Sequence, residues 1–232
     1  MGTNLYKKFL KGISLSFLFF FPFISFSTTY YTRGAGGNWS DVNTWSDLSC
    51  NGAAAASVPG AGDDVFICAS NGAGAVLVIT DGAFTCNNLT VGDGVADATV
   101  QTTPGNSLNV NGALQINSGN NANVYTLDAG FGTINVNGTF SWGTNGTNRV
   151  LLSTGTVTFA PLVNLSNANQ YVIFSGAGTI NFNAGFTCNQ SQAKFITFAG
   201  CTVNFGGSYI QSGPKNKWNA ASLAVFNCVG CY

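Results

Sequence analysis

Paired carboxylates carry acid–base chemistry in most enzymes that cleave polysaccharides, and this sequence offers few of them. It has eight aspartates and neither glutamate nor histidine, and its only adjacent acids are Asp63 and Asp64. That pair would suit an acid–base site, but it would equally suit the end of a Pro-Gly turn, where carboxylates accept backbone N–H groups. From Asn123 onward Asp128 is the only acid. We therefore expect no catalytic residues, no cofactor and no enzyme; a polysaccharide lyase or glycosidase is the alternative.

Two further acids stand close together in the segment GDGVAD. Asp93 and Asp97 could hold calcium through their oxygens, the ligands that this ion prefers. A simple acidic turn explains the same residues. We keep both interpretations and expect no other metal site.

The seven cysteines are typical of a secreted protein. Cys50 and Cys68 flank a Gly/Ala loop and are predicted to pair. Cys201 is predicted to reach Cys228 or Cys231 on a neighbouring strand, because stacked strands lie about 4.8 Å apart, within disulfide range. The spacing of Cys228 and Cys231 also occurs in redox and zinc sites, but no second cysteine pair or histidine accompanies it.

A regular array of uncharged side chains is the third candidate site. Its residues alternate with apolar ones along four short segments, so they should form one polar face. The bland interpretation is a solvated face whose side chains bond to each other, and the sharper one is a face that binds a glycan or a cell-surface component. Threonine rows on β-solenoids also resemble those of ice-binding proteins. The array comprises Thr133, Asn135, Thr156, Thr158, Thr179, Asn181, Thr202 and Asn204.

Tryptophans are a further means of binding sugars, because their rings stack on apolar sugar faces. Trp39 and Trp45 are expected in the core near the N-terminus. Trp142 and Trp218 fall in corners between predicted strands, where either exposure or packing is consistent with the sequence.

The array belongs to a repeat that defines the fold. The segments TINV, TVTF, TINF and TVNF begin 23 residues apart, at Thr133, Thr156, Thr179 and Thr202. Another apolar-alternating segment precedes each, with glycine or asparagine at the corners. Such short strands cannot each bury an apolar face alone, so consecutive copies must stack. We predict an all-β, right-handed parallel β-helix of about 23 residues per coil.

Other architectures fit the repeat less well. A leucine-rich repeat would need its own leucine frame and a helical back, and a β-sandwich would not hold one register over four copies. A left-handed β-helix uses hexapeptide units. The same register continues upstream more loosely, through SLNVNG at Ser107 and NLTVGDG at Asn88, at intervals of 26 and 19 residues.

Residues 1–27 have the layout of a secretory signal: Lys7, Lys8 and Lys11, then an apolar run, then small residues at Ser25 and Ser27. A membrane anchor is the alternative, although the run is shorter than the ~20 apolar residues that span a bilayer. Cleavage would leave five basic residues and eight aspartates, a net charge near −3. Such a surface does not suit nucleic acid or anionic lipid, so we expect neutral or weakly cationic partners and a secreted or cell-surface location.

Residues 28–93 contain the phrases GGNWSDVNTWS, SVPGAGDDVFIC, VLVITDG and CNNLTVGDG. This segment resembles the G8-type module and the N-terminal part of large secreted β-helix proteins of Bacteroidota-type bacteria. The resemblance implies a cap and first coils, followed by coils over residues 94–232 and by domains downstream of an unfinished end. It also implies an adhesin or a glycan-associated protein, or a polysaccharide-degrading enzyme. We expect a structural or binding protein.

Overall fold

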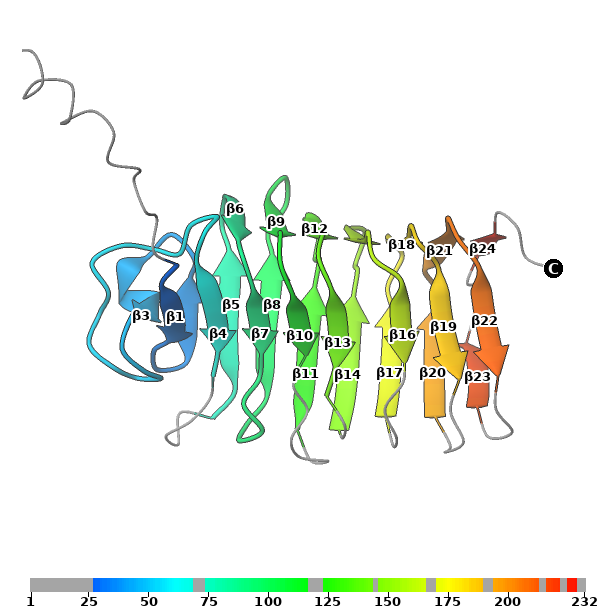
Figure 1. The fold of residues 1–232 in the computed structure, drawn as a ribbon, viewed down its shortest axis with the longest axis horizontal. Coiled ribbons are helices and arrows are strands. Elements are labelled where there is room, and N and C mark those ends of the chain that lie inside the picture. The colour runs from blue at the N-terminus through cyan, green and yellow to red at the C-terminus, as the bar shows by residue number, and fades with distance from the viewer. Residues whose placement is uncertain are drawn as a thin grey trace, which may run out of the picture.

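Short strands of alternating apolar and polar residues stack into a parallel β-solenoid, seen in a computed structural model (Figure 1). The structure describes residues 27–68, 74–116, 123–143, 146–165, 170–189, 194–212, 216–221 and 225–228. Within these residues the only helix is the short 3-10 helix η1 (Val42–Thr44). No helix there is long and apolar enough to cross a membrane. The predicted signal lies outside the described residues except for Ser27.

Each coil contributes one strand to each of three faces. Sheet 1 contains β2 (Gly36–Asn38), β5 (Val76–Thr80), β8 (Ala98–Thr102), β11 (Val124–Asp128), β14 (Gly146–Leu151), β17 (Gln170–Ser175), β20 (Lys194–Ala199) and β23 (Asn216–Ala221). Sheet 2 contains β6 (Ala83–Cys86), β9 (Ser107–Val110), β12 (Thr133–Val136), β15 (Thr156–Phe159), β18 (Thr179–Phe182), β21 (Thr202–Phe205) and β24 (Val225–Cys228).

The third face has two hydrogen-bonded parts in one row, because β13 contacts β16. We call the row sheet 3. Its first part contains β3 (Trp45–Ser46), β1 (Thr29–Thr32), β4 (Asp64–Ile67), β7 (Leu89–Val91), β10 (Leu114–Ile116) and β13 (Phe140–Trp142). Its second part contains β16 (Val163–Leu165), β19 (Phe186–Asn189) and β22 (Tyr209–Ser212).

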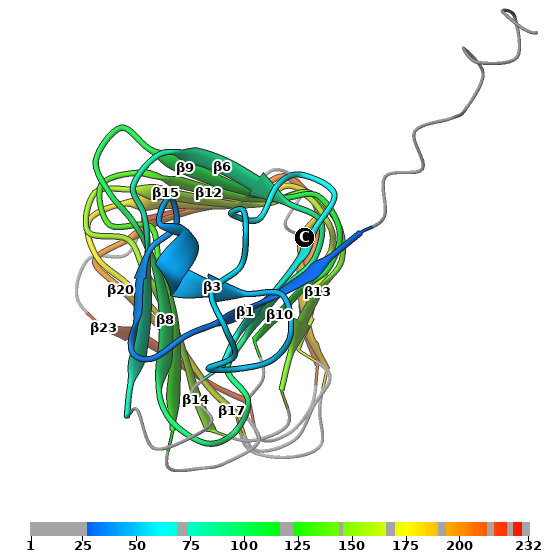
Figure 2. The ribbon, with the colours of Figure 1, turned by 90° about the vertical axis from the view of Figure 1, so that its left-hand side faces the viewer.

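The hand of the solenoid can be followed in Figure 2, which views it from the end that carries β1 and β3. From there the chain passes from β8 on the left, over β9 at the top, to β10 on the right, and each later coil lies further from the viewer. This clockwise, receding path is right-handed, as the sequence predicted and as parallel crossovers generally are.

The register of sheet 2 confirms the predicted repeat and corrects one part of it. Ser107 pairs with Thr133, as expected, but its partner on the other side is Ala83, in β6. The predicted copy at Asn88 is wrong, because Leu89–Val91 is β7 and pairs within sheet 3. Alternation in three residues does not reveal which face a strand belongs to. Strands of sheet 2 start at intervals of 24, 26 and then four times 23 residues.

The interior is filled by columns of identical or similar side chains. Phe159, Phe182 and Phe205 stack almost parallel from coil to coil, with ring centroids 5.5 and 5.4 Å apart. From sheet 1, Phe174 meets Phe182 edge-on at 5.8 Å and stacks on Phe198 at 4.8 Å. Offset-stacked and edge-on rings are the favoured aromatic geometries, so the column adds specific packing to apolar burial.

Glycines form a second column at the corner before sheet 2. A Cβ added to Gly132 or Gly155 would lie 2.6 or 2.7 Å from a carbonyl oxygen of the coil below. At Gly178 it would collide with the Gly155 carbonyl in the same way. The absence of a side chain therefore lets successive corners approach to the distance that strand pairing requires.

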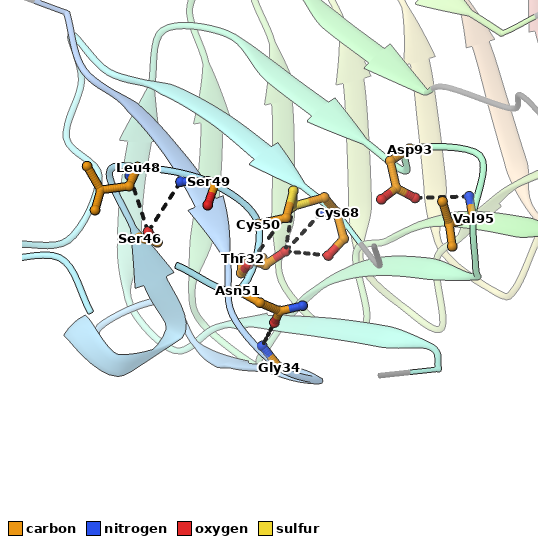
Figure 3. The surroundings of a disulfide bond; sticks show 10 residues. All are labelled: Thr32, Gly34, Ser46, Leu48, Ser49, Cys50, Asn51, Cys68, Asp93 and Val95. Atoms are coloured by element: carbon orange, nitrogen blue, oxygen red, sulfur yellow. Dashed lines mark hydrogen bonds between the residues drawn. A yellow bond between two sulfur atoms is a disulfide. The ribbon is translucent and has the colours of Figure 1, made fainter. Parts of the chain in front are cut away.

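The N-terminal end of the solenoid is closed by η1, β2, β3 and the loop that follows. Trp39 and Trp45 are fully buried there, with ring centroids 4.9 Å apart, and the Trp45 indole donates to the Trp39 carbonyl at 2.9 Å. Both expectations for these residues are confirmed. The predicted Cys50–Cys68 disulfide is present and ties the loop to the end of β4, beside the buried Thr32 (Figure 3).

The predicted disulfide between Cys201 and Cys228 is wrong, since Cys201 is a buried free thiol. Cys201 directly precedes Thr202, which pairs with Val225, whereas Cys228 pairs with Phe205. Four residues of strand, about 13 Å, therefore separate the two positions, beyond disulfide range. Cys228 is disulfide-bonded, and Cys231, the other predicted partner of Cys201, lies outside the described residues.

Replacement of Phe182 by alanine should test the aromatic column. The side chain is fully buried and touches rings on both neighbouring coils, so Phe182→Ala is expected to lower the free energy of unfolding by about 3–5 kcal/mol. Urea denaturation followed by circular dichroism would measure it. The control is Phe131→Ala, because Phe131 is 61% exposed; an equal loss in both variants would contradict the prediction.

Removal of the cap disulfide should also destabilise the protein. The bridge closes a loop with a sequence separation of 18 residues, and loop-closure entropy predicts a loss of about 3 kcal/mol in Cys50→Ala/Cys68→Ala. Chemical denaturation without reductant provides the measurement. Reductant should lower the stability of the native protein toward that of the double variant, and an unchanged midpoint in the variant would refute a stabilising role.

Candidate binding face

The eight predicted array residues lie together on the outer surface of sheet 2, which we call the Thr/Asn face. Thr133, Thr156, Thr179 and Thr202 pair directly across four consecutive strands. All eight are partly exposed, while the alternating residues between them are buried. The period-two pattern therefore places the polar column outside and the apolar column inside, as predicted.

Side chains of the asparagine column are hydrogen-bonded along the solenoid axis. Asn204 donates its amide N–H to Asn181 Oδ1 at 2.7 Å, and Asn181 donates to Thr158 Oγ1 at 3.2 Å. Asn135 donates to Asn109 Oδ1 at 2.8 Å. These bonds fix the amide planes in a common orientation, so the face is ordered before any ligand meets it.

The array extends beyond the predicted residues at both ends. Asn109 in β9 pairs with Asn135, and Asn227 in β24 donates to Asn204 Oδ1 at 2.8 Å. Ser107 continues the threonine column at one end. The segment SLNV carried the signal for Ser107 and Asn109, but the stricter 23-residue interval excluded it. Asn227 follows an apolar pair and had no threonine to mark its register.

The chemistry available to this face is that of neutral donors and acceptors. An asparagine has two N–H donors and an acceptor oxygen with two lone pairs. Within the column Asn181 and Asn204 each use one donor and one lone pair, which leaves one of each for solvent or a ligand. No strand of sheet 2 places a charged residue on the outer surface. The face can therefore recognise hydroxyl groups, but it has no ionic attraction.

The adjacent acids Asp63 and Asp64 are occupied by separate structural bonds. Asp63 accepts the backbone N–H of Thr28 at 3.0 Å with one oxygen and that of Gly60 at 2.9 Å with the other. Oδ1 of Asp64 accepts the side-chain amide groups of Asn87 at 2.9 Å and Asn88 at 2.8 Å. The two carboxylates thus hold different parts of the cap.

The other predicted acidic sites are also tied to backbone groups. Asp93 accepts the N–H of Val95 at 3.0 Å, and Asp97 accepts that of Val124 at 2.7 Å. Over the residues that the structure covers, no three His, Cys, Asp or Glu side chains gather closely enough to hold a metal ion. Asp128 is nearly buried and accepts the Gln101 side-chain amide at 2.6 Å.

The tryptophans predicted in corners do not form an exposed platform. Trp142 is a strand residue of β13, only 4% exposed, and its ring meets Phe140 edge-on with centroids 4.4 Å apart. Trp218 lies in β23, paired with Ile196, and its side chain is outside the described part of the structure. Packing is therefore the role of Trp142.

Comparison with known proteins gives no relative: no family model, no curated protein and no solved structure matches the chain. The resemblance to a G8-type module remains a prediction. Function must therefore be inferred from the faces of the solenoid themselves.

A buried thiol beneath the Thr/Asn face gives a pH-dependent prediction. Burial, and secondarily the charge of Asp64, raise the pKa of Cys86 to about 12. The unfolded thiol ionises near 8.5, so the folded state resists ionisation and loses stability as the pH rises from there toward 12. Unfolding midpoints measured across this range should fall more steeply for the native protein than for Cys86→Ala; parallel slopes would contradict the assignment.

Proposed function

We propose that the protein is a non-catalytic binding protein, secreted or displayed at the cell surface, whose Thr/Asn face binds a neutral, hydroxyl-rich polymer such as a glycan. The observation that carries the proposal is the in-register column of hydrogen-bonded asparagines beside a column of threonines. No single position in it is chemically special. The function then comes from repetition rather than from a catalytic constellation.

A polymer suits this geometry better than a small molecule. Rows repeat about every 4.8 Å across strands, and the two columns lie about 6.8 Å apart along each strand. A flat face without a pocket buries little of a small ligand, whereas an extended chain can form weak hydrogen bonds on several coils at once. Linked weak contacts raise the overall affinity without any one strong contact.

The extracellular setting of the proposal rests on separate features. The Cys50–Cys68 disulfide is of the kind that persists in oxidising compartments. The N-terminal 27 residues have the layout of a secretory signal. The G8-like phrases between Gly36 and Gly94 point the same way, toward adhesins and glycan-associated proteins, and toward further domains downstream.

The same face supports ice binding as a second candidate. Four threonines in direct register on a flat, uncharged surface are suited to ordering water at regular intervals. The asparagine column weakens this candidate, because its amides are engaged with one another. A polysaccharide-active enzyme is a third candidate, and it would have to use Asp63 or Asp64.

A pair of lysines on the face should test the proposal. Thr156→Lys/Thr179→Lys places two flexible charges across adjacent coils and is expected to weaken binding at least tenfold. Co-sedimentation of the protein from residue 28 onward with insoluble cellulose, chitin and xylan, and a glycan array for soluble ligands, would measure this. The matched control is Ser141→Lys/Asn164→Lys, on exposed positions of adjacent strands in sheet 3.

Each candidate has its own outcome. Equal binding by both variants would place the ligand elsewhere, and no binding to any polysaccharide would reject glycan recognition by this face. Inhibition of ice recrystallisation, lost in the threonine variant only, would favour the second candidate. Release of reducing or unsaturated ends, lost in Asp63→Asn or Asp64→Asn, would establish an enzyme instead.

A further inference from the structure

The start of the first strand meets a carboxylate that is already held in place. The backbone nitrogen of Thr28 lies 3.0 Å from Asp63 Oδ1, and the other carboxylate oxygen accepts the N–H of Gly60 at 2.9 Å. On its other side, the Thr28 carbonyl accepts the N–H of Asp64 at 2.9 Å. Thr28 is therefore fixed through both its nitrogen and its carbonyl, immediately before β1 begins at Thr29.

Asp63 has no cationic side chain beside it in the described part of the cap. The nearest candidate in sequence to β1, Arg33, donates to the carbonyls of Gly52 and Asn43 instead. A carboxylate that accepts only neutral N–H groups can still take a positive charge at favourable cost, because charge-assisted hydrogen bonds are about twice as strong as neutral ones.

We propose that Asp63 is the binding site for a new amino terminus, produced by cleavage of the Ser27–Thr28 peptide bond. The small residues Ser25 and Ser27 stand at the positions that a signal peptidase reads before its cleavage site. Hydrolysis breaks the C–N bond, gives the hydroxyl of water to the Ser27 carbonyl carbon and its proton to the Thr28 nitrogen. The resulting amine takes a further proton from solvent and becomes an ammonium group.

Cleavage would thus change the chemistry of the contact without moving its atoms. The uncleaved chain offers Asp63 one neutral N–H, whereas the cleaved chain offers an ammonium with three N–H donors and a unit charge. The ion pair stabilises the charged form of the amine, so its pKa in the folded protein is raised above the ordinary value of about 7.7–8.0. This stabilisation is complete below the unfolded pKa and is lost as the pH rises through the folded one.

The proposal rests on the secretion assumed in the proposed function, but not on any ligand. Its first test is the intact mass of the full-length chain after secretion by its own cells. A mass that begins at Thr28 is expected. A mature chain that begins at any other residue, or that keeps the leader, overturns the proposal whatever the glycan experiments give.

The second test measures the amine itself. Competitive labelling with acetic anhydride, read by mass spectrometry, reports the N-terminal amine separately from lysines. In Asp63→Asn the labelling rate at pH 8 should rise about threefold or more relative to the native mature chain, as a fall of half a pKa unit requires. Asp47→Asn, which removes the same charge from an exposed cap position, should leave the rate unchanged.

A chain that retains Ser27 as its first residue separates the ion pair from a purely structural effect. Its amine lies one residue before the site, so its labelling rate should not respond to Asp63→Asn. An equal response in both chains, or none in the Thr28 chain, would refute the assignment of Asp63. Failure of glycan binding alongside these expected results would reject the proposed function only.

Discussion

In-register parallel pairing is the constraint on which the rest of this structure depends. Successive coils lie about 4.8 Å apart, the hydrogen-bonding distance between strands, so each side chain rests on its counterpart in the next coil. A residue type therefore succeeds only if it packs well against a copy of itself. Phenylalanine does so inside through ring stacking, asparagine does so outside through amide hydrogen bonds, and glycine does so at the corners through close backbone approach.

The same constraint explains the unusual composition. Like charges directly opposite each other across strands are destabilising, and only 7% of the residues are charged. An uncharged outer surface is thus favoured by the fold itself, before any ligand is considered. The threonines and asparagines of sheet 2 satisfy stacking and recognition with the same atoms, which is why the binding role needs variants that disturb the outer surface and spare the interior.

The sequence predicted the solenoid, its hand and the inward and outward residues of β12 to β21, because four copies at a constant interval fix the period and the phase together. It could not fix the phase where the interval changes: Leu89–Val91 has the same alternation as a sheet 2 strand but belongs to sheet 3. Cys201 failed for a related reason, since the strands ending at Phe198 and Phe226 belong to different sheets. Partners such as Asp63 and Thr28, 35 residues apart, depend on cap geometry that has no repeat to reveal it.

Charge is allowed where stacking ends. Of the thirteen charged residues from Thr28 onward, eight lie at or before Asp97, in the cap and first coils, where irregular loops place no identical residue above or below them. There Arg33 can bind two carbonyls, and Asp63 and Asp64, although adjacent, can hold different segments. The molecule therefore divides its chemistry along its axis: specific ionic contacts are confined to the cap, and any partner of the coils must be recognised by repeated neutral hydrogen bonds.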